Sequence, residues 1–246
     1  MKTGLCTIAF RDRSFEAVLD LAVGAGFDGV ELHGWFVPGT SDLTWVWFHG
    51  NAGNISHRVD NLVEVHKRLG VAVFIFDYRG YGRSQGTPSE KGTYLDAEAA
   101  MAYLGSRGDV NQNGLVLFGR SLGSAVAVEV VKVHAVYALI IESPLTSVQR
   151  LAGRMYPLFP GIGRLITTKY DTLSKVRGIR TPFMVLHGDR DEIVPFDMGE
   201  EIFAAANTPK RFYTIEGAGH NDTYVVGGVE YFDALKIFLE NPTGRG

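Results

Sequence analysis

One stretch of the chain decides its fold: Leu115-Val-Leu-Phe-Gly-Arg-Ser-Leu-Gly-Ser-Ala-Val-Ala-Val-Glu-Val-Val131. It opens with four apolar residues, passes through Gly119-Arg-Ser-Leu-Gly123, and continues as a run of small and apolar residues typical of a buried helix. A sharp turn from strand to helix needs glycines because side chains at those positions would clash. The stretch therefore predicts a buried strand, a tight turn that presents Ser121, and a helix.

The G-x-S-x-G pattern occurs a second time, as Gly82-Arg-Ser-Gln-Gly86. This copy follows the polar segment Asp77-Tyr-Arg-Gly-Tyr81 and runs into Pro88, which opposes an immediate helix. No apolar run abuts it, so it predicts a loop. Ser121 rather than Ser84 is the predicted nucleophile.

Outward from this stretch, short apolar runs alternate with segments long enough to form helices. Most runs are apolar at both odd and even positions, as in strands buried on both faces of a parallel sheet. The sequence therefore predicts an α/β fold with a mainly parallel central sheet flanked by helices. The predicted strands are Thr44–Phe48, Val71–Phe76, Leu115–Phe118, Ala138–Ile141, Phe183–Leu186 and Arg211–Ile215. The predicted helices are Ser56–Leu69, Tyr94–Gly105, Leu122–His134, Met198–Ala206 and Glu230–Leu239.

Composition narrows the class of protein. The chain has 246 residues, a net charge of −3 and one cysteine, Cys6. The charge gives no sign of a nucleic-acid partner, and the apolar runs fall short of the ~20 residues that a membrane-spanning helix needs. No phosphate-binding loop or dinucleotide fingerprint is present, and we expect no secretory leader. We expect a cytoplasmic protein that acts on a small molecule, without a nucleic-acid or membrane partner.

A serine hydroxyl needs a base that takes its proton and an acid that orients the base. His220 is the predicted base because it lies in the loop Glu216-Gly-Ala-Gly-His-Asn-Asp222, directly after the last apolar run. The segment after the preceding run offers Asp189, Asp191 and Glu192 as the acid. The residues alone do not separate Asp189 from Asp191.

A tetrahedral intermediate also needs amide donors for its oxyanion. The backbone amide of Leu122, next to the nucleophile, is one predicted donor. The glycine-rich loop Phe48-His-Gly-Asn-Ala-Gly-Asn54 supplies the other, with Asn51 as the first choice and Ala52 as the second. This chemistry needs no metal and no organic cofactor.

Between Pro144 and Thr181 no strand is predicted, although the segment is rich in bulky apolar residues. Insertions of this kind often form a lid over a site. We predict a small cap at about residues 145–180, in which Met155, Tyr156 and Phe159 contact the substrate. The alternative is a pair of helices that simply packs on the sheet.

Several segments, taken together, resemble the α/β-hydrolase superfamily, and within it the serine-aminopeptidase-like and thioesterase-like branch. They are His49-Gly-Asn-Ala-Gly-Asn54, Asp77-Tyr-Arg-Gly-Tyr-Gly-Arg-Ser84, Gly119-Arg-Ser-Leu-Gly123, Glu142-Ser-Pro144, His187-Gly-Asp-Arg-Asp-Glu-Ile-Val-Pro195 and Gly219-His-Asn-Asp222. The resemblance implies that Asp191 is the acid of the triad. It also implies a cofactor-free hydrolase of carboxylic esters, and the short insertion predicts short to medium acyl chains. A thioesterase or peptidase with the same triad, and a non-catalytic binding protein, are the alternatives.

The N-terminus departs from this family. Residues 29–246 form the predicted hydrolase domain, whereas residues 1–28 form an atypical segment with a strand at 4–10 and a helix at 14–25. Residues 4–34 resemble the first βαβ unit of sugar-phosphate isomerase or epimerase barrels. The metal-binding Glu and His residues of those barrels have no counterpart downstream. The atypical segment offers a surface through which two copies of the chain could form a homodimer.

Overall fold

The computed structural model describes residues 31–156, 158–159 and 161–244. The predicted strand at 4–10, the predicted helix at 14–25 and any homodimer contact made through them lie outside the described residues. Within the described residues, the first strand is β1 (Gly34–Val37).

In the described part of the chain, seven strands form one sheet in the order β1-β3-β2-β4-β5-β6-β7. β1 runs antiparallel to β3, and the other neighbouring pairs are parallel. The predicted mainly parallel sheet is confirmed. Besides β1, the strands are β2 (Thr44–Phe48), β3 (Ala72–Phe76), β4 (Leu115–Arg120), β5 (Ala138–Glu142), β6 (Phe183–Gly188) and β7 (Lys210–Ile215).

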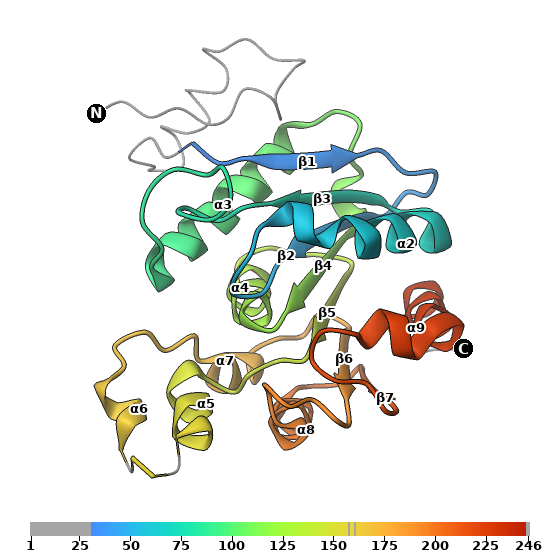
Figure 1. Ribbon diagram of the computed structural model, residues 1–246. Coiled ribbons are helices and arrows are strands. Elements are labelled where there is room, and N and C mark those ends of the chain that lie inside the picture. Colours follow the sequence, from blue (N-terminus) through green and yellow to red (C-terminus); the bar gives the residue numbers. More distant parts are fainter. Residues whose placement is uncertain (1–30, 157, 160, 245–246) are drawn as a thin grey trace.

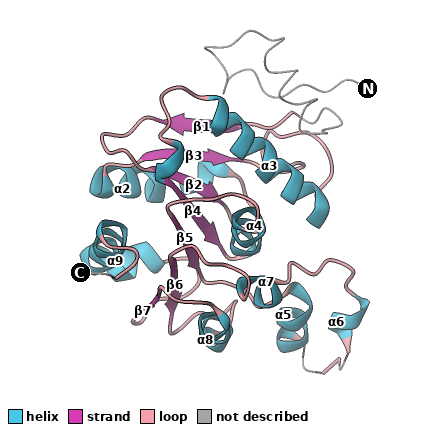
Figure 2. Cartoon of the chain, turned by 180° about the vertical axis from the view of Figure 1, so that it is seen from behind, coloured by secondary structure: helices cyan, strands magenta, loops and turns pink. Residues whose placement is uncertain are grey.

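Helices cover both faces of this sheet (Figure 1, and from behind in Figure 2). α2 (Val59–Leu69) and α9 (Thr223–Glu240) lie on one face. The opposite face carries α3 (Glu90–Ser106), α4 (Leu122–Val131), α7 (Thr172–Val176) and α8 (Phe196–Ala205). Alternate strand residues serve the two sides, as Leu117 packs with α4 while its neighbour Val116 packs with α9. The apolar residues at both odd and even positions reflect these two buried faces.

Helix boundaries differ from the predicted ones for local reasons. α3 begins four residues before Tyr94 because the Ser89 side chain accepts a hydrogen bond from the Gly92 amide and caps the helix. The segment predicted as one helix from Ser56 is divided into a 3₁₀ turn, η2 (Ile55–Arg58), and α2. α9 begins at Thr223 and is kinked at Gly228, whose φ of 49° is outside the helical range.

The insertion after β5 contains α5 (Val148–Met155), α6 (Ile162–Leu165) and α7. Its inner part packs on the body of the protein, since Tyr170 and Val176 are buried in the core beside α4. Its outer part is exposed: Leu158 is 88% and Leu165 83% accessible to solvent. The inner part therefore packs on the body of the protein, as the alternative to a cap predicted, and only the outer part projects away from it.

Parallel strands bring their carboxyl ends to one edge of the sheet, and ligands of open α/β sheets bind at that edge. The segments that follow β2, β4, β6 and β7 contain Asn51, Ser121, Asp191 and His220. The topology therefore gathers at one edge four residues that are far apart in the sequence.

The junction between β4 and α4 generates a stability prediction. A Cβ atom on Gly123 would collide with the backbone carbonyl oxygen of Phe48, and neither backbone can move without disturbing β2 or α4. We expect Gly123→Ala to lower the free energy of unfolding by about 1–3 kcal/mol, the usual cost of overpacking. Thermal and urea unfolding of the purified variant measure the change.

Gly153→Ala is the matched control. Gly153 lies inside α5, and a Cβ atom there meets no heavy atom within 4 Å. Alanine in a helix interior is favoured over glycine by roughly 0.5–1 kcal/mol, so this variant should be as stable as the parent or slightly more stable. A Gly123→Ala protein as stable as Gly153→Ala would contradict the packing argument.

Candidate active site

Ser121 lies at the one-residue junction between β4 and α4. Its φ of 52° and ψ of −119° place a non-glycine residue outside the ordinary regions, at a cost of order 1–3 kcal/mol. The surroundings hold it there, because the Ser121 amide donates to the Glu142 carbonyl at 2.8 Å. Gly119 is needed because a Cβ atom there would collide with the Gly123 carbonyl. This geometry projects the serine side chain beyond the edge of the sheet.

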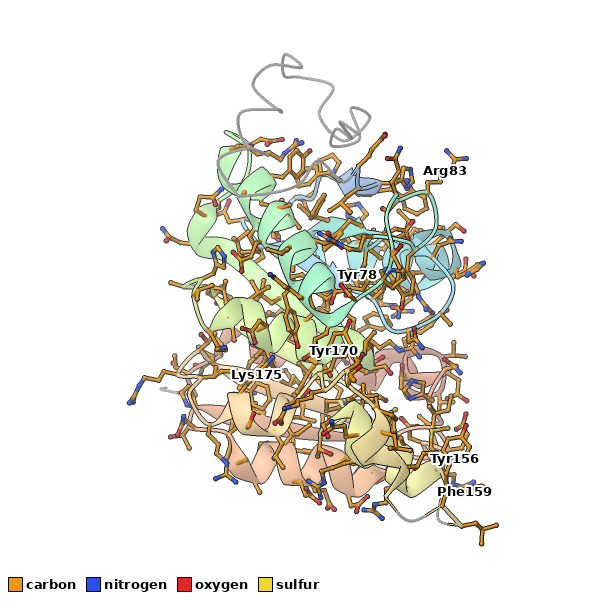
Figure 3. The ribbon with its side chains drawn as sticks, turned by 90° about the vertical axis from the view of Figure 1, so that its left-hand side faces the viewer. Tyr78, Arg83, Tyr156, Phe159, Tyr170 and Lys175 are labelled. Atoms are coloured by element: carbon orange, nitrogen blue, oxygen red, sulfur yellow. The ribbon has the colours of Figure 1, made fainter. Side chains whose placement is uncertain are left out.

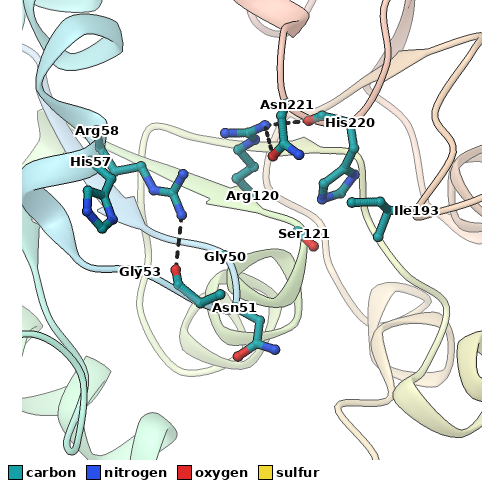
Figure 4. Close-up of a pocket in the computed structure, with 11 residues that line it drawn as sticks. Gly50, Asn51, Gly53, His57, Arg58, Arg120, Ser121, Ile193, His220 and Asn221 are labelled. Carbon is teal, nitrogen blue, oxygen red and sulfur yellow. Dashed lines mark hydrogen bonds between the residues drawn. The ribbon is translucent and has the colours of Figure 1, made fainter.

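A cavity of about 420 Å³ opens beside Ser121 (Figure 4). It lies at the carboxyl edge of the sheet, between the loop after β2 and the His220 loop. Its walls combine polar and apolar surface and include two arginine side chains. The lining residues are Gly50, Asn51, Ala52, Gly53, His57, Arg58, Arg120, Ser121, Ile193, His220 and Asn221.

The structure brings His220 and Asp191 together. His220 Nδ1 lies 2.8 Å from Asp191 Oδ2, while Asp191 Oδ1 accepts from the amides of Ile193 and Val194 at 2.9 and 2.7 Å. Burial alone would raise the pKa of Asp191, but its contacts with His187 and His220 hold that pKa well below its usual range. An ionised Asp191 fixes the proton of His220 on Nδ1, which leaves Nε2 as the atom able to accept a proton.

Asp189 lies elsewhere, although the residues alone left it equal to Asp191. Its side chain is exposed, and Oδ1 accepts from the Gly217 amide at 2.6 Å. It therefore supports the turn after β7. Glu192 accepts from the backbone amide of His220 at 3.2 Å and contacts the loop rather than the ring.

The predicted amide donors lie on the two sides of the nucleophile. Leu122 is the first residue of α4, so its N–H is one of those without an acceptor inside the helix. Asn51 and Ala52 both line the cavity, and Asn51 Oδ1 is held by the hydroxyl of Tyr81 at 2.7 Å. Their loop packs against the elbow, since an added Cβ on Gly50 would lie 3.2 Å from the Ser121 Cβ.

Arg120 is a site residue that the sequence reasoning missed. Its Nε lies 3.1 Å from Glu142 Oε1, and the Glu142 carboxylate also accepts from the hydroxyls of Thr223 and Tyr231 at 2.9 and 2.7 Å. The guanidinium of Arg120 also donates to the His220 carbonyl. This network ties the elbow to the loop that carries the base. An arginine and a glutamate at the ends of two neighbouring buried strands were the available signal.

Three residues that were predicted to contact the substrate lie away from the cavity. Met155, Tyr156 and Phe159 are 54%, 51% and 64% exposed, and none of them lines it. Figure 3 shows Tyr156 and Phe159 at the outer corner of the molecule, on the segment between α5 and α6. The apolar composition of the insertion correctly indicated bulky side chains but not the direction in which its outer part projects.

The second G-x-S-x-G copy is a loop, as predicted. Ser84 is buried, its hydroxyl donates to the Asp77 carbonyl at 2.6 Å, and it accepts from the His33 amide at 2.9 Å. His49 is also buried, and burial lowers its pKa to about 4. Ser84 and His49 therefore act as structural groups that hold the loops behind the site.

The described residues contain no group of three or more His, Cys, Asp or Glu side chains placed to hold a metal ion. Within the same residues, no helix combines the length and apolarity required to cross a membrane.

Comparison with known proteins gives concordant matches. The family model described as serine aminopeptidase, S33, matches residues 40–174. An uncharacterised protein of Mycobacterium tuberculosis is 39% identical over 215 residues, which cover 86% of this chain and 76% of that protein. The α/β hydrolase domain-containing protein WAV2 of Arabidopsis thaliana is 35% identical over 233 residues, which cover 87% and 76%.

Among solved structures, an esterase of Pyrococcus furiosus superposes with a TM-score of 0.73 at 22% identity, covering 88% of each chain. At this level of identity the match shows a shared fold. The resemblance of residues 4–34 to a sugar-phosphate isomerase barrel finds no support in these comparisons.

The two G-x-S-x-G copies generate a labelling prediction. A serine activated by a neighbouring histidine reacts with a fluorophosphonate, whereas a buried serine bonded to backbone groups does not. We expect one adduct per chain, on Ser121, located by mass spectrometry of the digested protein.

Ser84→Ala should keep the label and Ser121→Ala should lose it. An adduct on Ser84 would overturn the assignment of the nucleophile.

Proposed function

The chain belongs to the serine aminopeptidase S33 family of the α/β-hydrolase superfamily, and from this membership we propose that it hydrolyses carboxylic esters through a Ser121–His220–Asp191 triad. One observation carries the proposal. Ser121 and His220 line the same cavity, and His220 Nδ1 lies 2.8 Å from the buried Asp191 carboxylate. These are the nucleophile, the base and the orienting acid that acyl transfer requires.

The proposed reaction has two steps. His220 Nε2 takes the hydroxyl proton of Ser121 while the serine oxygen attacks the acyl carbon, and Asp191 stabilises the imidazolium that forms. The backbone amides of Leu122 and Asn51 bind the oxyanion. His220 then protonates the departing alcohol, and a water molecule activated by the same histidine releases the acid from Ser121.

Esters are the proposed substrates because the structurally similar Pyrococcus protein is an esterase. The same triad could attack a thioester or a peptide, and the relative rates on aryl esters and acyl thioesters decide between these substrates. If the folded protein hydrolyses none of these substrates, the result would instead favour a non-catalytic binding protein. A cytoplasmic location and a homodimer formed through the N-terminal segment stay predictions from the sequence.

The cavity volume supports small substrates. About 420 Å³ accommodates a short or medium acyl ester, and the exposed outer part of the insertion adds no described wall to it. Each CH₂ group that is buried contributes about 0.8 kcal/mol until the available space is filled.

The assignment of the acid yields a mutational prediction. Asp191→Asn favours the wrong histidine tautomer, and we expect kcat for an aryl ester to fall about 10³–10⁴-fold. Asp189→Asn is the matched control, because Asp189 bonds to the Gly217 amide and should have a far smaller effect. The reverse ranking, with both variants folded, would move the acid to Asp189.

The size of the cavity yields a second prediction. In a series of 4-nitrophenyl esters from acetate to dodecanoate, kcat/KM should rise over the first few acyl carbons and then fall. Tyr156→Ala and Phe159→Ala test the cap prediction. If the outer insertion covers the site, these substitutions should shift the acyl-chain length at which kcat/KM is highest. An unchanged profile in both variants would show that the outer insertion does not contact the acyl chain.

A further inference from the structure

Two guanidinium groups face the cavity beside Ser121 (Figure 4). Arg120 is buried at 6% exposure, and Arg58, from η2, is half-buried. Ester hydrolysis by a serine triad does not require either cation. Each of them therefore serves either the protein's own structure or the binding of the substrate.

The charge of Arg120 is neutralised inside the protein. Glu142, which is fully buried, lies 3.1 Å from its Nε, and Nη2 of Arg120 donates to the His220 carbonyl and, at 3.4 Å, to Asn221 Oδ1. Arg120 thus serves the protein's own network.

The charge of Arg58 has no such partner among the described residues. Its Nη2 donates to the Ala52 carbonyl at 3.2 Å, and its Nε is buried without a hydrogen-bond acceptor. Burial lowers the pKa of Arg58, and the nearby positive charge of Arg120 lowers it further. An arginine begins from a pKa so high that it stays protonated, so Arg58 is a partly desolvated cation that lacks a counter-charge.

The rest of the cavity wall suits an anion. None of the described residues that line it is acidic, and the carboxylates of Glu142 and Asp191 lie behind Arg120 and His220. A cleft lined by one sign of charge concentrates ligands of the opposite sign. A guanidinium without a counter-charge binds a carboxylate through charge-assisted hydrogen bonds, and a single positive charge balances the single negative charge of a carboxylate.

We propose that Arg58 selects ester substrates that carry a carboxylate group, which it binds in the cavity next to Ser121. This inference rests on the proposed ester hydrolysis and names its substrate class. The carboxylate can belong to the leaving alcohol or to the acyl chain, and the two positions are distinguished by the choice of ester.

Two matched pairs of esters test the proposal. For the leaving group, 4-carboxyphenyl butyrate is compared with 4-(methoxycarbonyl)phenyl butyrate. For the acyl chain, mono-4-nitrophenyl adipate is compared with methyl 4-nitrophenyl adipate. The measured quantity is the ratio of kcat/KM for the anionic ester to that for its neutral partner, determined from release of the phenol. Intrinsic reactivity cancels when the ratio in a variant is divided by the ratio in the parent.

In Arg58→Gln, the ratio for one of the two pairs should fall about tenfold or more, as expected for loss of a hydrogen bond to a charged group. The pair that responds identifies where the carboxylate is carried. Arg58→Lys keeps the charge and should retain part of the preference. Arg83→Gln removes an exposed arginine outside the cavity and should leave both ratios at the parent values.

Unchanged ratios in a folded Arg58→Gln protein would overturn the proposal and leave Arg58 as a support for the Asn51 loop. If the parent hydrolyses none of the four esters, the proposed function fails instead. Binding of a carboxylate by Arg58 is then tested without turnover. In this test, 4-hydroxybenzoate and adipate are titrated into Ser121→Ala and into Ser121→Ala/Arg58→Gln, and binding is followed by NMR. Equal binding, or no binding, to the two proteins would also overturn the proposal.

Discussion

The close contact between Gly123 and the carbonyl of Phe48 is the constraint on which the rest of the site depends. It allows α4 to begin directly after β4, with a single residue, Ser121, at the junction. That residue adopts a φ of 52° and so directs its side chain away from the packed sheet. The same contact holds the end of β2 against the elbow, and the loop after β2 therefore lies beside the nucleophile. The glycine therefore sets the position of both Ser121 and the loop that carries Asn51, the proposed amide donor.

A second constraint connects the elbow to the base. Arg120 and Glu142 are paired in register on neighbouring strands, and Glu142 also accepts from the hydroxyls of Thr223 and Tyr231, both in α9. A buried ion pair is weak support for stability, because desolvation offsets most of its attraction. The contribution of this pair is to geometry. Arg120 also donates to the carbonyl of His220, so the positions of His220 and Ser121 are both fixed relative to β4 and β5.

The sequence predicts the sheet well because burial on both faces leaves a simple pattern, in which Val116 and Leu117 are both apolar but pack on opposite sides. Context also separates Ser121 from Ser84. Arg58 and Arg120 escape such reasoning because they are 62 residues apart in the sequence and become neighbours only at the cavity. Arginine is ordinarily a surface residue, so nothing local distinguishes Arg58 from an exposed one such as Arg83. The outward direction of Tyr156 is likewise a tertiary property.

The positive charges near Ser121 can serve two purposes that compete. The amino end of α4 and the guanidinium of Arg58 both favour negative charge, whether it develops on the oxyanion or is already present on a substrate. A carboxylate held by Arg58 cancels part of the field that would stabilise the oxyanion. In the proposed reaction this conflict is limited, because Arg120 is neutralised by Glu142 and the proposed oxyanion donors are uncharged amides. In the proposed reaction, transition-state stabilisation depends on the Leu122 and Asn51 amides, and the proposed role of Arg58 is to discriminate between substrates.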